Sequence, residues 1–126
     1  MSEYNVEFYT KPTGEKPVKD FLFSLNPKMR AKMLREIELL ENNGPKLREP
    51  DSKPLGDGIF ELRAKFSNDI TRVLYFFYVG KNIVLTNGFV KKTQKTPPAE
   101  IETAKKYREE YLSRKEVTKG VNLESF

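Results

Sequence analysis

The core of the fold is predicted by residues 58–90, GIFELRAKFSNDITRVLYFFYVGKNIVLTNGFV. In residues 58–66 apolar and charged side chains alternate, which is the period of a strand with one buried face. Residues 70–79 are apolar at nearly every position, so they predict a long central strand. Residues 83–90 predict the next strand. Because two short polar turns join the three segments, the sequence predicts an antiparallel meander.

Helices are predicted before and after this meander. Pro17 is placed to open a first helix, and Asn26-Pro27 ends that helix and caps a second one. The second helix has an apolar stripe at spacings of four and three, formed by Met29, Met33, Ile37 and Leu40. Beyond the meander, Thr96-Pro97 begins a third helix, which we expect to end near Arg114.

The fold class that follows is α+β, with the element order β-α-α-β-β-β-α. A period-2 segment at residues 4–9 supplies the first strand, while residues 44–58, rich in proline and glycine, are expected to form a loop. We expect a mainly antiparallel twisted sheet, with the helical hairpin and the C-terminal helix packed on one face. Residues 1–115 are predicted to form a single domain and residues 116–126 a loose tail.

Composition excludes several kinds of chemistry. The chain has no cysteine and no histidine, so it has no disulfide, no thiolate nucleophile and no Ser-His or Cys-His pair. Between residues 61 and 95 the carboxylates are only Glu61 and Asp69, too few for a two-metal site, and neither a metal nor a cofactor is expected. The longest apolar stretch, Val73–Val79, is too short to span a bilayer. We therefore expect a soluble, cytoplasmic protein.

Positive charge is concentrated in one part of the chain. Residues 1–60 and 96–126 each hold equal numbers of basic and acidic side chains, so the net charge of +5 comes from residues 61–95. The basic side chains of that region are Arg63, Lys65, Arg72, Lys81, Lys91, Lys92 and Lys95. Because such a patch attracts polyanions, it indicates a nucleic-acid partner. The alternative is a solvated face of a mildly basic protein.

Arg63 and Arg72 are the first candidates for a functional site. Their strands are neighbours in the meander, so both guanidinium groups are expected to converge on one face of the sheet. The alternative is an ion pair of Arg72 with Glu61 or Asp69, because arginine is seldom buried without a partner.

Lysines and an aromatic ring complete the candidate surface. Lys91, Lys92 and Lys95 follow the last strand, where they either line one end of the sheet or form a solvated charge run. Phe89 precedes them and is the ring that we expect to stack on RNA bases. The other aromatic residues of the region are better explained as sheet core: Phe66, Tyr75 and Tyr78.

Three segments carry a resemblance to a known family. LGDGIFELR, then ITRVLYFF, then GFVKKTQKTPPAEIETAKKY resemble the phage-derived, HigB-type branch of the RelE/HigB toxin superfamily. The resemblance runs from about Tyr4 to about Tyr111, and GFVKKTQKTP is its most specific part. It implies a compact sheet with flanking helices. It also implies the toxin of a type II toxin–antitoxin pair, which cuts mRNA in the ribosomal A site and is neutralised by a helix-turn-helix antitoxin.

By position, the resemblance assigns the basic strand residues of the family to Arg63 and Arg72. It assigns the basic residues that follow the last strand to Lys91 and Lys92. The acid and base roles of histidine-bearing members do not transfer, because this chain has no histidine. Lys91 or Lys92 is then the best candidate for proton transfer and Glu61 a weaker candidate for base. We expect RNA to be bound by Lys53, Lys65, Phe89 and Lys95.

The working hypothesis is a metal-independent, ribosome-dependent mRNA endoribonuclease, in which the ribose 2′-OH attacks the adjacent phosphate and leaves a 2′,3′-cyclic phosphate. Its expected partners are mRNA, the ribosome and a cognate helix-turn-helix antitoxin, with no membrane. The antitoxin would cover the basic patch or contact the helical hairpin. One alternative is a non-catalytic RNA- or ribosome-binding regulator of phage origin. Another is an inactive relic of a toxin.

Overall fold

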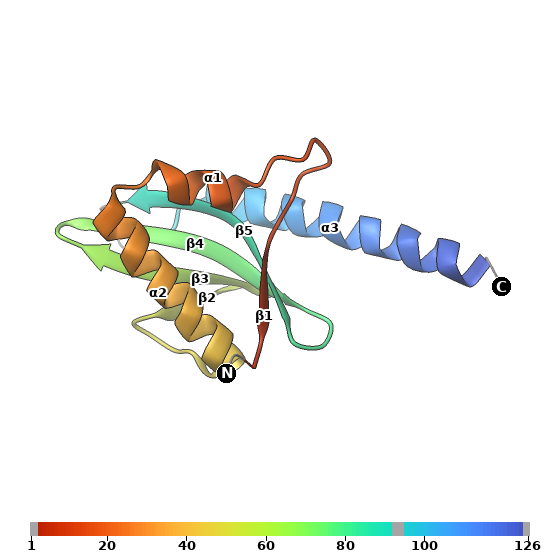
Figure 1. The fold of residues 1–126 in the computed structure, drawn as a ribbon, viewed down its shortest axis with the longest axis horizontal. Helices are drawn as coiled ribbons and strands as arrows, with labels where there is room; N and C mark the ends of the chain where they lie inside the picture. Colours follow the sequence, from red (N-terminus) through yellow and green to blue (C-terminus); the bar gives the residue numbers. More distant parts are fainter. Residues whose placement is uncertain (1–2, 92–94, 125–126) are drawn as a thin grey trace.

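The computed structural model describes residues 3–91 and 95–124, and the side chains of these residues except Lys91 and residues 116–124. Its elements follow the predicted order, with one additional strand (Figure 1). They are β1 (Asn5–Phe8), α1 (Pro17–Ser24), α2 (Pro27–Asn43), the 3-10 turn η1 (Gly44–Lys46), β2 (Ser52–Gly56), β3 (Ile59–Phe66), β4 (Asp69–Tyr78), β5 (Asn82–Lys91) and α3 (Pro98–Glu124).

One twisted sheet contains all five strands in the order β1-β5-β4-β3-β2 (Figure 1). The meander β2-β3-β4-β5 is antiparallel throughout, and β1 pairs parallel to β5, from Asn5 opposite Asn82 to Phe8 opposite Leu85. The predicted α+β class and the mainly antiparallel sheet are therefore confirmed.

Strand β2 corrects the expectation that residues 44–58 form a loop. Ser52 lies opposite Leu62 of β3, and Pro54 lies opposite Phe60. Proline has no N–H to donate to a ladder, and it is tolerated on edge strands such as this one. The buried Ser52 hydroxyl also shares a short hydrogen bond with the hydroxyl of Tyr75. The strand is short and contains proline, so the intrinsic strand propensity of its residues does not predict it.

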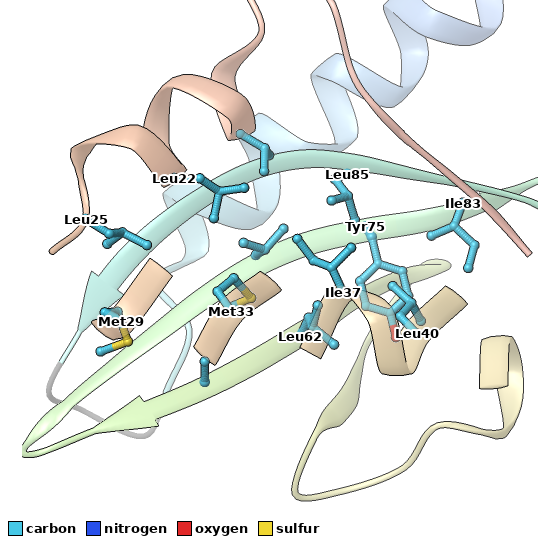
Figure 2. Close-up of a cluster of buried hydrophobic side chains, with 13 residues drawn as sticks. Leu22, Leu25, Met29, Met33, Ile37, Leu40, Leu62, Tyr75, Ile83 and Leu85 are labelled. Atoms are coloured by element: carbon cyan, nitrogen blue, oxygen red, sulfur yellow. The ribbon is translucent and has the colours of Figure 1, made fainter. Parts of the chain in front are cut away.

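The hairpin of α1 and α2 packs on one face of the sheet. The side chain of Asn26 accepts a hydrogen bond of 2.9 Å from the N–H of Met29, which is the predicted N-cap of α2. Figure 2 shows the stripe of Met29, Met33, Ile37 and Leu40 facing Leu62, Tyr75, Ile83 and Leu85 of the strands. This side is the hairpin face of the sheet.

Helix α3 packs on the opposite side, so the expectation that all helices share one face is wrong. Ala104 and Tyr111 of α3 join a second buried cluster with Leu74, Phe76 and Val84 of the strands. The reason lies in β4, which is apolar at consecutive positions and so needs cover on both faces. This side is the α3 face.

The C-terminal helix is longer than predicted. It ends at Glu124 instead of near Arg114 (Figure 1). The sequence prediction followed the apolar stripe, which fades before the helix ends, whereas residues 115–124 hold no proline that would stop it. The domain boundary at residue 115 stays a prediction. Within the part of the chain that the structure describes, no helix is long and apolar enough to cross a membrane.

Candidate nucleic-acid interface

The register of three strands places the predicted site residues in one row. Arg63 on β3 lies opposite Arg72 on β4, which in turn lies opposite Phe89 on β5. Residues opposite each other in a ladder point to the same face of the sheet. That face is the α3 face, because Leu74, two residues along β4 from Arg72, belongs to its cluster. The expected convergence of the two arginines on one face is thus what the register gives.

A carboxylate lies between the two arginines. Oε1 of Glu61 accepts a hydrogen bond of 2.5 Å from Nε of Arg63, and Oε2 of Glu61 lies 3.8 Å from Nη1 of Arg72. The hydroxyl of Thr96 donates a short hydrogen bond to Oε2 of Glu61. We call Glu61, Arg63, Arg72 and Thr96 the ion cluster. Arg72 therefore makes the ion pair with Glu61 that the sequence left open.

Burial differs within the ion cluster. The side chains of Glu61 and Arg72 are 0% exposed, whereas that of Arg63 is 19% exposed. Burial lowers the pKa of Arg72, the charge of Glu61 raises it, and the charge of Arg63 lowers it. Arginine nevertheless stays a cation in proteins. Arg63 is thus the member of the ion-paired trio that can reach a molecule in solvent, held in place by a carboxylate beneath it.

The other predicted binding residues lie around the ion cluster. Lys65 is exposed on β3, one alternation beyond Arg63. Lys53 is exposed on β2 opposite Glu61, and it lines a pocket of about 380 Å³ with Lys95, which is also exposed. Phe89 is half-buried and packs against the cluster of the α3 face, which leaves only part of its ring for stacking.

Two of the residues predicted for catalysis lie wholly or partly outside the described residues. The side chain of Lys91 and the whole of Lys92 lie outside the described residues. The backbone of Lys91 ends β5, opposite Ile70 of β4. Among residues 3–91 and 95–124, no group of three acidic side chains is arranged to hold a metal ion.

A second pocket, of about 300 Å³, opens beside Arg63 at the edge of the sheet. Its lining combines both signs of charge: Glu36, Pro50, Asp51, Arg63, Lys65 and Ile70. Burial and a hydrogen bond to Asp51 raise the pKa of Glu36 to about 7. This pair of carboxyl groups was not predicted from the sequence. One signal was present, because Glu36 lies three residues after Met33 and four before Leu40, on the flank of the apolar stripe of α2.

Comparison with known proteins gives one result for this chain. No curated protein matches it. A family model described as "Phage derived protein Gp49-like (DUF891)" matches residues 20–109, from α1 to the middle of α3 and so across the whole ion cluster. Since that region is well over half of the 126 residues, the chain belongs to the phage-derived Gp49-like family, which is in general a family of RelE/HigB-like toxins.

Proposed function

We propose that this protein is the toxin of a type II toxin–antitoxin pair, of the HigB-type branch, and that it cuts mRNA. The observation that carries the proposal is the ion cluster, in which the buried Glu61 fixes a partly exposed Arg63 on the α3 face of the sheet. Membership of a family of RelE/HigB-like toxins supports the toxin part of the proposal.

Arg63 is the proposed phosphate-binding group. A guanidinium presents several N–H donors in a plane, which suits the oxygens of a phosphodiester. When the 2′-OH attacks the phosphorus, negative charge grows on the phosphoryl oxygens, and a donor that is already oriented stabilises it. Removal of one such donor costs on the order of 10²–10³ in rate in other enzymes. The hydrogen bond of 2.5 Å to Glu61 supplies that orientation.

Glu61 and Arg72 receive a positioning role in this proposal. Both side chains are fully buried, so neither reaches a substrate in this conformation. Arg72 pairs with Glu61, and Glu61 in turn holds Arg63. This arrangement makes Glu61 a poorer candidate for the base. Proton transfer by Lys91 or Lys92 rests on the resemblance alone.

Lysines around the ion cluster would hold the RNA backbone. Lys53, Lys65 and Lys95 are exposed, and each could replace counterions along a single strand. A substrate held by the ribosome would arrive already oriented, which a site with few acid and base groups needs.

The antitoxin was expected to cover either the basic patch or the helical hairpin. Exposed apolar side chains on the hairpin favour the second surface, since Phe23 and Leu34 line a shallow apolar hollow together with Phe8 and Leu22. Replacement of Phe23 by serine should then weaken the toxin–antitoxin complex in a titration, while Lys65→Ala should leave its affinity unchanged. The reverse result would favour the basic patch.

A non-catalytic RNA- or ribosome-binding regulator is the second candidate. Full burial of Glu61 and Arg72 favours it, because two of the groups nominated for chemistry are enclosed. Both candidates use the same basic face, so they differ only in whether RNA is cut.

The test is cleavage of a defined mRNA in a purified translation system, with new 5′ ends mapped by primer extension, with and without ribosomes. We expect ribosome-dependent cuts by the wild type and a loss of about 10²–10³ in rate for Arg63→Ala. Lys81→Ala is the control, because Lys81 is exposed in the turn between β4 and β5 and lines none of the pockets described above. An mRNA with a 2′-deoxynucleotide at the cut position should resist.

Absence of cuts under every condition would replace the enzyme by the binding regulator. Cuts that persist in Arg63→Ala at the wild-type rate would move the site away from the ion cluster.

A further inference from the structure

The pocket at the edge of the sheet places two carboxyl groups beside Arg63. Strand β2 begins at Ser52, so the edge of β3 beyond Leu62 has no neighbouring strand. The segment just before β2 occupies part of that edge, and the pocket opens there between β3, β4 and α2.

Backbone contacts fix Asp51 in this pocket. The N–H of Arg63 donates to the carbonyl of Asp51 over 2.9 Å, as one further rung of the ladder between β2 and β3. The N–H groups of Asp51 and Ser52 both donate to the carbonyl of Arg48 over 3.0 Å. The residue that presents the proposed phosphate-binding guanidinium is thus joined directly to the residue that presents the carboxyl group.

Glu36 reaches the same pocket from α2. The side chain is half-buried, and its Oε2 atom is buried without a hydrogen-bond partner. Burial is the largest cause of the raised pKa of Glu36, followed by the hydrogen bond and the charge of Asp51, while Arg35 acts in the opposite direction. The charged groups around the pair are therefore Arg35 on α2 and Arg63 and Lys65 on β3.

We propose that Glu36 and Asp51 are the proton-transfer pair of this site. The inference rests on the proposed ribonuclease function and deepens it, because it supplies the acid and base that a chain without histidine lacks. Two neighbouring carboxyl groups in different environments can divide the roles of acid and base between them. Both groups lie in the pocket that Arg63 lines, where the scissile phosphate would be held.

The step balances without a metal or a cofactor. The ionised carboxylate takes the proton of the ribose 2′-OH as the bond between O2′ and phosphorus forms. The protonated carboxyl gives its proton to O5′ as the bond between phosphorus and O5′ breaks. The products are a 2′,3′-cyclic phosphate and a 5′-OH, and the pair ends with one proton, as it began. Arg63 stabilises the phosphoryl charge throughout.

The experiment compares isosteric variants of the full chain in the cleavage assay described above. Glu36→Gln and Asp51→Asn keep the size of each side chain and remove its proton exchange. We expect each to cut at least about 10²-fold more slowly than the wild type, as for removal of other general acids and bases. Binding of an RNA with a 2′-O-methyl group at the cut position should change by less than about threefold, because the arginine and lysines are intact.

The pH profile is a second readout. The wild-type rate should fall as the pH rises above about 7, where Glu36 loses its proton. That limb should be absent from the residual activity of Glu36→Gln. Glu38→Gln is the matched control, because Glu38 lies on the same helix and is exposed to solvent. It should cut at the wild-type rate with the wild-type profile.

The outcomes separate the inference from the proposed function. If the wild type cuts, Arg63→Ala does not and Glu36→Gln does so within about threefold of the wild type, the inference falls and the ribonuclease stands. A wild-type profile that is flat around pH 7 also overturns the inference, whether or not a variant folds. A wild type that never cuts removes the proposed function and the inference with it.

Discussion

The two faces of the sheet are built from alternate residues of the same strands, yet they have different contents. On the hairpin face, Leu62, Val73 and Ile83 belong to an apolar cluster with side chains of α1 and α2, and Figure 2 shows Leu62 facing the stripe of α2. On the α3 face, Glu61 and Arg72 are just as deeply buried, one position away along each strand. Because side chains alternate with a period of two, one strand can serve packing on one side and hold charges on the other.

The two faces contribute differently to the stability of the fold. Burial of apolar side chains on the hairpin face stabilises the fold, by on the order of 25 cal/mol per Å² of apolar surface removed from water. A buried ion pair contributes little net stability, because desolvation offsets most of the attraction. The ion cluster is therefore better explained by the geometry that it imposes on Arg63 than by any contribution to folding.

Removal of one buried charge should have the largest effect. Arg72→Ala leaves Glu61 enclosed with one cation fewer, and the free energy of unfolding should fall by about 3–5 kcal/mol. Val73→Ala is the matched change on the hairpin face, at an equally buried neighbouring position, and should cost about 2 kcal/mol. Urea denaturation measures both. Equal losses would erase the distinction between the faces, and partial recovery in Glu61→Gln/Arg72→Met would sharpen it.

A methyl group added on the hairpin face should have the next largest effect. Gly88 lies opposite Val73 on that face, and a Cβ there would overlap Cδ2 of Phe21 in α1. The helix or the ring must shift, so Gly88→Ala should lower the free energy of unfolding by about 1–3 kcal/mol. Phe21→Leu in the same chain should recover part of the loss in a double-mutant cycle. No loss in the single variant would mean that the packing of α1 is loose.

The pH should affect the stability of the protein through Glu36, with lower stability at higher pH. The pKa of Glu36 is about 7 in the folded chain against an ordinary 4.5, so the fold favours the protonated form. The contribution of Glu36 to the free energy of unfolding is fully present at pH 4 and is lost as the pH rises through 7. Glu36→Gln should therefore be more stable than the wild type at pH 8, by about 1 kcal/mol after allowance for solvent screening, and equal to it at pH 4. Thermal unfolding of both proteins at the two pH values is the measurement. Equal unfolding midpoints of Glu36→Gln and the wild type at pH 8 would contradict the prediction.

The smallest effect is expected for a single exposed lysine of the α3 face. Lys65→Ala should weaken binding of single-stranded RNA a few-fold and lower the slope of log affinity against log salt by about 0.7. Lys81→Ala, in the turn between β4 and β5, should leave both quantities unchanged. A slope that both variants lower equally would mean that charge acts over the whole protein and not on one face.

Much of the fold could be predicted from the sequence because its signals are local. Alternation in residues 58–66 gave the face of each side chain in β3, and short turns gave the antiparallel pairing that sets Arg63 beside Arg72. Strand β2 could not be predicted, because its pairing with β3 and not its own residues makes it a strand. The face of the sheet on which α3 packs could not be predicted either, because an apolar stripe does not indicate which side of a sheet a helix will cover.

The candidate site was predictable only along the strands. Glu61, Arg63 and Arg72 are close in sequence and were singled out together. Their burial could not be predicted, because it depends on the segment that carries Thr96 and on α3 packing over the same face. Glu36 comes from a helix on the other side of the sheet edge. Its neighbour in the pocket, Asp51, lies in a segment that was expected to be loop, so nothing connected the two.

The parallel pairing of β1 with β5 also bears on how the chain is made. Asn5 and Asn82 are neighbours across that ladder although 77 positions separate them, and Tyr111 donates a hydrogen bond to Glu7. Contacts between residues so far apart in sequence cost more loop-closure entropy. They therefore slow folding. During vectorial synthesis the first strand must wait for the last one. The nascent polypeptide can therefore complete its sheet only after β5, which ends at Lys91, has been synthesised.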